Sequence, residues 1–147
     1  MIDIQTLFDK AHLHEGMHIA DFGCGRTGHI VLPASKVIGD RGIVYAVDII
    51  RQILIEVDKR ARDIGIINIH PVWGDLEREG GVAIPKESLD IAFLTNVLVQ
   101  SDKVYDILEQ ISGLLKNKAR FVIVDWVKKG LSFGPDHNRF VNFEDVS

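Results

Sequence analysis

Five short apolar segments alternate with amphipathic segments along the chain. The apolar segments are rich in Val, Ile and aromatic residues and are apolar on both faces in places, which is typical of strands covered on both sides of a sheet. We therefore expect strands at HIADF (18–22), GIVYAVDI (42–49), INIHPVW (67–73), LDIAFLTN (89–96) and ARFVIVDW (119–126).

The intervening segments have the periodicity of helices. Apolar residues recur on one face over 28–38, 51–64 and 102–116, and each of these patterns predicts a helix packed on the sheet. Ser101 is a candidate N-cap of the third helix, and Asn117 is a candidate terminator.

Strands that alternate with helices predict right-handed βαβ units and a parallel sheet. We expect an α/β fold with a three-layer, doubly wound sheet, which binds its ligand at the carboxyl ends of its strands. The length suits a single domain over 1–147. Within it, 1–16 would form an N-terminal helix and lead-in, and 127–147 a C-terminal extension.

A glycine-rich loop follows the first strand. Gly23, Gly25 and Gly28 spell G-x-G-x-x-G, a pattern in which glycine allows a tight turn and a close approach of the ligand to the backbone. Asp48, at the end of the second strand, could accept hydrogen bonds from two ribose hydroxyls. Both features also fit nicotinamide-dependent dehydrogenases, so alone they predict a nucleotide site without identifying the nucleotide.

Three observations favour S-adenosylmethionine over a dinucleotide. Asp21 stands two residues before the first glycine, where a carboxylate would repel a pyrophosphate but attract a sulfonium and an ammonium group. Asp75, in WGDLE after the third strand, could meet an adenine amino group. No Y-x-x-x-K pattern occurs around Tyr45 or Tyr105, so the apparatus for hydride transfer is missing.

Charge and composition limit the kinds of molecule that the chain is expected to bind. The net charge of −4 argues against a large nucleic-acid footprint. Cys24 is the single cysteine and the 6 histidines have no metal-site spacing, so neither an intrachain disulfide nor a metal is expected. Because the chain has no charged-then-apolar leader and no apolar run of about 18 residues, we expect a cytoplasmic protein without a membrane span.

These motifs resemble those of the class I, Rossmann-like, S-adenosylmethionine-dependent methyltransferases. GMHIADFGCGRTGHIVLPASKVIG is similar to the first motif of that family, GIVYAVDI to its second acidic motif and GDLE to its third. The segment 89–126 is similar to the fourth strand, the following helix and the fifth strand. The resemblance covers roughly 5–135 and is to the small-molecule branch that includes the ubiquinone/menaquinone C-methyltransferases.

The resemblance implies that S-adenosylmethionine, and its product S-adenosylhomocysteine, bind in loops at the strand ends. The methionine part would lie along the backbone of Gly23 and Gly25, Asp21 would reach the ammonium group, and Asn96 would lie near the methionine end. The commonest loop of the family is D-x-G-x-G-x-G, and Thr27 stands at its third glycine here. The loop is therefore expected to be wider. The implied cofactor-binding residues are Asp21, Gly23, Gly25, Thr27, Gly28, Asp48, Ile49, Asp75, Leu76 and Asn96.

The adenosine part would be held by the loops after the second and third strands. By the same resemblance, Asp48 would bind the ribose hydroxyls and Asp75 would accept from the adenine amino group. Ile49 and Leu76 would pack beside the adenine ring.

The resemblance also implies a parallel sheet in the order 3-2-1-4-5 that lacks the last two strands of the family, a C-terminally truncated version of its fold. VNFEDVS is expected to begin a helix capped by Asn142. The fifth strand would then be an exposed edge, whose unpaired backbone groups favour a homo-oligomer. The segment 127–141 would lie near the mouth of the site or across the exposed face.

The sequence thus predicts an enzyme that moves a methyl group to a small-molecule acceptor by direct displacement. Such chemistry needs mainly alignment and exclusion of water, so the catalytic residues stay unknown. TNVLVQ after the fourth strand lacks the Asn/Asp-Pro-Pro-aromatic motif of nucleic-acid amino methylation, and His29 is a candidate for facing the substrate. Two alternatives remain open: a non-catalytic or partner-completed S-adenosylmethionine-binding module, and an RNA methyltransferase.

Overall fold

The computed structural model describes residues 3–95, 103–125 and 140–144. Its strands form a 6-stranded parallel sheet in the order β3-β2-β1-β4-β5-β6, so the expected α/β class and the order 3-2-1-4-5 of the first five strands are confirmed. The strands are β1 (His18–Phe22), β2 (Ile43–Asp48), β3 (Ile69–Trp73), β4 (Leu89–Thr95), β5 (Leu115–Asp125) and β6 (Phe140–Glu144). The helices are α1 (Ile4–Ala11), α2 (Val31–Ile38), α3 (Arg51–Asp63) and α4 (Val104–Leu114).

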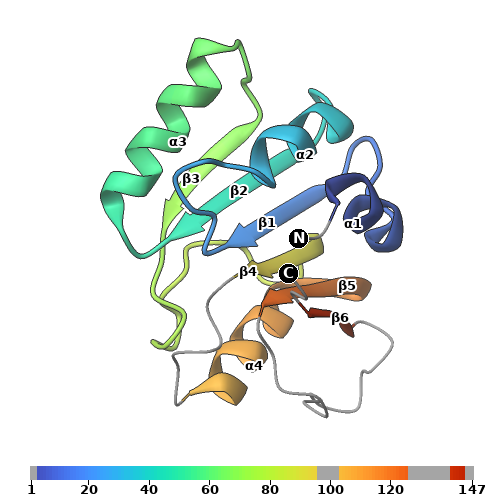
Figure 1. The fold of residues 1–147 in the computed structure, drawn as a ribbon. Helices are drawn as coiled ribbons and strands as arrows, with labels where there is room; N and C mark the ends of the chain where they lie inside the picture. Colours follow the sequence, from blue (N-terminus) through green and yellow to red (C-terminus); the bar gives the residue numbers. More distant parts are fainter. Residues whose placement is uncertain (1–2, 96–102, 126–139, 145–147) are drawn as a thin grey trace.

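Helices cover the sheet on both faces (Figure 1). α1, α2 and α3 share one buried apolar cluster with one face of the sheet, and α4 shares a second cluster with the other face. Along β1, Ile19 lies in the first cluster and Ala20 in the second; along β4, Phe93 and Leu94 divide in the same way. This alternation follows from the two-residue period of a strand, and it explains why the strand sequences are apolar on both faces.

The helix α3 illustrates how the sequence sets an element and its end. Its buried residues recur at helical spacing and are Ile53, Leu54, Val57 and Ala61. The helix ends where Gly65 takes a positive φ of 76°, and Ile66 N–H donates to the Ala61 carbonyl at 2.8 Å, the pattern of a Schellman C-cap. None of the helices in the described ranges is long and apolar enough to cross a membrane.

The boundary between α4 and β5 differs from the prediction. α4 ends at Leu114 and β5 begins at the next residue, so Asn117 lies inside the strand and does not terminate the helix. The start of β5 is irregular, because the register shifts before Ile91 pairs with Arg120 and because Lys118 has a φ of 67°. The predicted start of the strand at 119 matches the regular part alone. Ser101 lies outside the described residues.

The prediction for the end of the chain is wrong. Residues 140–144 form the strand β6, parallel to β5, with Asn142 opposite Ile123, where the sequence suggested the start of a helix. β5 is therefore an inner strand, and β6 is the last strand of the sheet on that side, so the argument for self-association through β5 no longer holds. The physical reason is that the unpaired N–H and C=O groups along β5 can form hydrogen bonds with any extended segment that lies beside them. The sequence of a five-residue segment does not show whether it will pair in this way or form a helix.

Candidate functional site

The carboxyl ends of the first four strands lie at one edge of the sheet. Phe22 at the end of β1 is level with Val47 of β2 and with Leu94 of β4, and Asp48 is level with Trp73 of β3. The expected convergence of the strand ends is therefore observed for β1, β2 and β3. Asn96, the predicted site residue after β4, lies outside the described residues.

Backbone hydrogen bonds join the loops that leave these strands. Gly23 N–H and Cys24 N–H donate to the Val47 carbonyl oxygen at 2.8 and 3.1 Å, and Gly74 N–H donates to the Asp48 carbonyl oxygen at 3.1 Å. Since each loop is tied to β2, the three loops hold a fixed arrangement around the end of that strand.

All three glycines of the loop after β1 require their conformational freedom. Gly23, Gly25 and Gly28 have φ values of 79°, 74° and 61°, in the left-handed region that favours glycine. Their surroundings differ, because a Cβ on Gly28 would crowd Leu32 and Val31 of α2 at 3.1–3.3 Å, whereas a Cβ on Gly25 would have no atom within 4 Å. Gly28 packs the loop against the helix, and Gly25 leaves open space beside the backbone.

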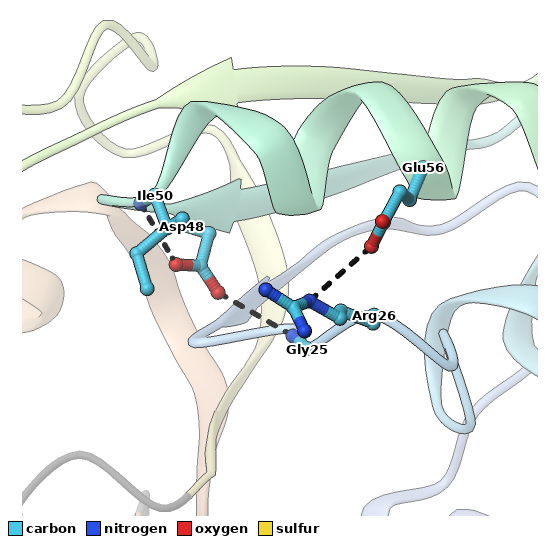
Figure 2. A network of polar contacts seen from close by, with 5 residues as sticks. All are labelled: Gly25, Arg26, Asp48, Ile50 and Glu56. Atoms are coloured by element: carbon cyan, nitrogen blue, oxygen red, sulfur yellow. Dashed lines mark hydrogen bonds and ion pairs between the residues drawn. The ribbon is translucent and has the colours of Figure 1, made fainter.

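Asp48 lies between the glycine loop and the first turn of α3 (Figure 2). Its Oδ1 accepts from Ile50 N–H at 3.0 Å, and its Oδ2 accepts from Gly25 N–H at 3.4 Å. The residue is 8% exposed. A carboxylate has about four acceptor positions, so Asp48 is held in place with capacity left for two ligand hydroxyls.

A second carboxylate lies beneath the loop. Asp21 is fully buried in β1, and its charge acts on Cys24 together with that of Asp48. Burial raises the pKa of the Cys24 thiol far above its ordinary value, and the charges of Asp21 and then Asp48 raise it further. The thiol is therefore neutral and unsuited to nucleophilic attack. The same two charges make the loop a favourable place for a cationic ligand and an unfavourable one for a phosphate.

The outer part of the loop is polar and exposed. Arg26 Nε lies 3.3 Å from Glu56 Oε2 on α3 (Figure 2), and Thr27 Oγ1 lies 3.3 Å from His29 Nδ1. Arg26 and Thr27, of which Thr27 is one of the implied cofactor-binding residues, are both exposed and lie at the rim of the loop. In the part of the chain that the structure describes, no three His, Cys, Asp or Glu side chains are grouped as a metal site requires.

The loop after β3 carries the third predicted carboxylate. Asp75 Oδ1 accepts from Glu77 N–H at 3.0 Å, and the half-buried Leu76 packs against the apolar cluster on the α4 side. The sequence suggested a helical turn and a loop between β3 and β4, and the structure has turns and no helix over 74–88.

Two residues that contact the site loops carried no functional prediction. Trp73 Nε1 donates to the Ile49 carbonyl at 2.7 Å while the Arg51 guanidinium lies 4.8 Å from the indole centroid, and Gln110 of α4 bonds to the loop after β3. Their partners are 22 to 34 positions away in the sequence, so no local pattern reports these contacts. Ile49, the predicted adenine neighbour, is 53% exposed and is thus available to a ligand.

Comparison with known proteins gives one family and several relatives. The family described as methyltransferase domain matches residues 13–138. Aklanonic acid methyltransferase DauC of a Streptomyces species is 32% identical over 87 residues, 59% of this chain and 38% of that protein. A probable cobalt-precorrin-6B C(15)-methyltransferase (decarboxylating) of Methanosarcina acetivorans is 27% identical over 125 residues, 85% of this chain and 63% of that protein. The chain thus spans less than two thirds of the length of either relative.

The fold also has close counterparts among solved structures. A SAM-dependent methyltransferase from Aquifex aeolicus aligns with a TM-score of 0.75 at 24% identity, covering 90% of this chain and 69% of that one. At this identity the likeness concerns the fold alone, and it agrees with the sheet order described above.

Proposed function

The chain belongs to the methyltransferase domain family, and from that premise we propose that it binds S-adenosylmethionine and transfers its methyl group to a small-molecule acceptor. The observation that carries the proposal is the pair of carboxylates at the glycine loop, Asp21 and Asp48, both buried and both acting on Cys24. S-adenosylmethionine is positively charged and has no phosphate, so it suits this potential, whereas the pyrophosphate of a dinucleotide does not.

Different described residues bind different parts of the cofactor. Asp48 binds the ribose hydroxyls, for which its two backbone bonds leave acceptor capacity. Gly23 and Gly25 line the methionine part, where the open side of Gly25 admits a ligand. Asp21 attracts the ammonium group through the buried end of β1, directly or by way of water.

The adenine ring would be held between the loops after β2 and β3. Asp75 accepts from its amino group, and the exposed Ile49 and the half-buried Leu76 pack beside it. Thr27 and Gly28 shape the loop, and Asn96 near the methionine end remains a prediction from the sequence.

The cofactor supplies a methyl group that its sulfonium has already activated for displacement. The protein then contributes alignment of the acceptor with that methyl group and exclusion of water. A general base is required only for an acceptor that must lose a proton as it is methylated, so the need for one depends on the acceptor and the catalytic residues stay unassigned. A small-molecule acceptor is supported by the two relatives, which are named for aklanonic acid and a cobalt-precorrin.

The proposal is tested by calorimetry of the intact chain with S-adenosylmethionine, S-adenosylhomocysteine and NAD. We expect binding of the first two and none of NAD; equal binding of NAD would favour a dinucleotide site. Asp48→Asn should weaken binding of S-adenosylhomocysteine by about 1–3 kcal/mol, the cost of removing a charged acceptor. Asp90→Asn is the matched control. Asp90 accepts from His18 N–H at 2.8 Å and pairs with Lys116 at 3.0 Å at the amino ends of the strands, away from the candidate site.

Methyl transfer is tested separately with labelled cofactor and a cell extract fractionated by size and class. Label in small molecules supports the proposal, and label in RNA favours the alternative acceptor. Binding without transfer to any fraction favours a cofactor-binding module or one completed by a partner.

Self-association and a cytoplasmic location remain predictions from the sequence. With β5 paired to β6, association by strand pairing would use the outer edge of β6 or that of β3, and Pro71 within β3 disfavours the latter. Light scattering that gives a monomer at every concentration would contradict association.

A further inference from the structure

A glutamine on α4 holds one of the loops of the cofactor site from outside. Gln110 Nε2 donates to the Leu76 carbonyl oxygen at 2.7 Å, and Gln110 Oε1 accepts from Gly81 N–H at 3.2 Å. A backbone carbonyl can only accept and a backbone N–H can only donate, so a single orientation of the amide satisfies both bonds. In Figure 1 the connection between β3 and β4 runs down beside α4, which brings the two segments together.

The loop that Gln110 holds is closed on itself. Asp75 N–H donates to the Gly81 carbonyl at 3.0 Å, Arg78 N–H to the Asp75 carbonyl at 3.2 Å, and Gly81 N–H to the Arg78 carbonyl at 2.9 Å. The turn is so tight that a Cβ on Gly81 would collide with the Asp75 carbonyl oxygen. Residues 75–81 therefore behave as one compact unit, whose placement depends on the groups that anchor it.

Gln110 anchors this unit at both of its ends. The Leu76 carbonyl is one residue from the Asp75 side chain, and Gly81 N–H lies at the return of the loop, where the Gly81 carbonyl accepts from Asp75 N–H. Gln110 is half-buried, on a helix whose buried face includes Ile107 and Ile111, so its own position is set by core packing.

We propose that Gln110 is a positioning residue that sets the preference of the cofactor site for adenine, by fixing the Asp75 carboxylate where it meets the purine 6-position. This inference rests on the proposed function, since it takes Asp75 as the acceptor of the adenine amino group. A fixed carboxylate accepts from an amino group but is repelled by the 6-oxo group of hypoxanthine. A carboxylate on a released loop can move away from the oxo group and toward the N1–H donor that hypoxanthine has beside it, so the discrimination is lost.

The test is calorimetry with two ligands, S-adenosylhomocysteine and S-inosylhomocysteine, which differ at the purine 6-position. The wild-type chain should prefer the adenosyl compound by about tenfold to a hundredfold, the value of one charge-assisted hydrogen bond. Gln110→Met, which keeps the length of the side chain and removes both bonds, should lower this preference to about threefold or less, because small displacements of a binding group have large effects.

Two further variants separate positioning from folding. Glu109→Met makes a similar change at the neighbouring exposed position of the same helix and should keep the wild-type preference. Gln110→Glu keeps the acceptor for Gly81 N–H but sets an oxygen against the Leu76 carbonyl, so it should release that end of the loop and lower the preference even where Gln110→Met fails to fold.

The outcomes distinguish this inference from the proposed function. If the wild-type chain binds and prefers S-adenosylhomocysteine, and the Gln110 variants lose stability but retain the preference, Gln110 is merely structural and the inference is overturned while the proposed function stands. Equal binding of both ligands to the wild-type chain overturns the role of Asp75 and the inference with it. Failure of the wild-type chain to bind either ligand overturns the proposed function itself.

Discussion

Two glycines of this fold have the same left-handed φ and equally open surroundings, but only one of them borders the proposed cofactor. Gly25 has a φ of 74° and Gly65 a φ of 76°, and an added Cβ would meet no atom within 4 Å at either position. Alanine in the left-handed region costs about 1–2 kcal/mol, so Gly25→Ala and Gly65→Ala should lose similar stability. In a chain of 147 residues this corresponds to a melting temperature lower by about 3–8 °C.

Ligand binding should separate the two variants. Gly25 borders the proposed cofactor, and Gly65 follows the far end of α3, a helix of 13 residues and hence about 20 Å long. A methyl group forced into a fitted space costs about 1–3 kcal/mol, so Gly25→Ala should bind S-adenosylhomocysteine about 5- to 150-fold more weakly, while Gly65→Ala should bind like the wild type.

The measurement combines thermal unfolding with calorimetry on both variants. Equal and undiminished binding would refute the reasoning, because it would mean that no ligand approaches the backbone at Gly25. Equal loss of binding in both variants would also refute it, since the effect would then come from backbone strain and not from the site.

Three further predictions concern stability. Asn68→Ala removes the buried amide that donates to the carbonyls of Ser35 and Gly39 at 2.9 and 2.8 Å; urea unfolding should show a loss of about 1–3 kcal/mol, with cofactor binding unchanged. Burial is the first cause of the raised pKa of the Cys24 thiol. The folded chain therefore keeps this proton at a pH at which the unfolded chain, with the ordinary pKa of 9.0, loses it. The stability that the protonated thiol contributes is complete below pH 9.0 and is lost as the pH rises above 9.0. Unfolding at pH 9 and 10 should therefore show the wild type losing about 1 kcal/mol relative to Cys24→Ala; parallel pH dependences would contradict this. Glu56→Gln breaks the exposed ion pair with Arg26 at 3.3 Å and should change the free energy of unfolding by less than about 0.5 kcal/mol, which a larger change in a urea titration would disprove.

The arrangement of the candidate site could be predicted in part, because its main residues directly follow strand ends. Asp48 and Asp75 come at or just after the ends of β2 and β3, and parallel strands bring such positions to one edge. The left-handed glycines were predictable for the same reason, since a tight turn after a strand requires them. The contacts of Trp73 and Gln110 were not predictable, because each side chain bonds to a backbone carbonyl in another element.

The sequence by itself determined the layered α/β architecture. Strands buried on both faces are continuous apolar runs and helices buried on one face repeat apolar residues every three to four positions, so both patterns are local. The continuation of the chain into β6, the early start of β5 and the anchoring of the loop after β3 by Gln110 were decided by the tertiary structure alone. Each of these three features supplies hydrogen-bond partners to backbone groups of a segment that is distant in the sequence. Such a backbone group must be paired, but its partner is set by the three-dimensional arrangement and not by neighbouring residues.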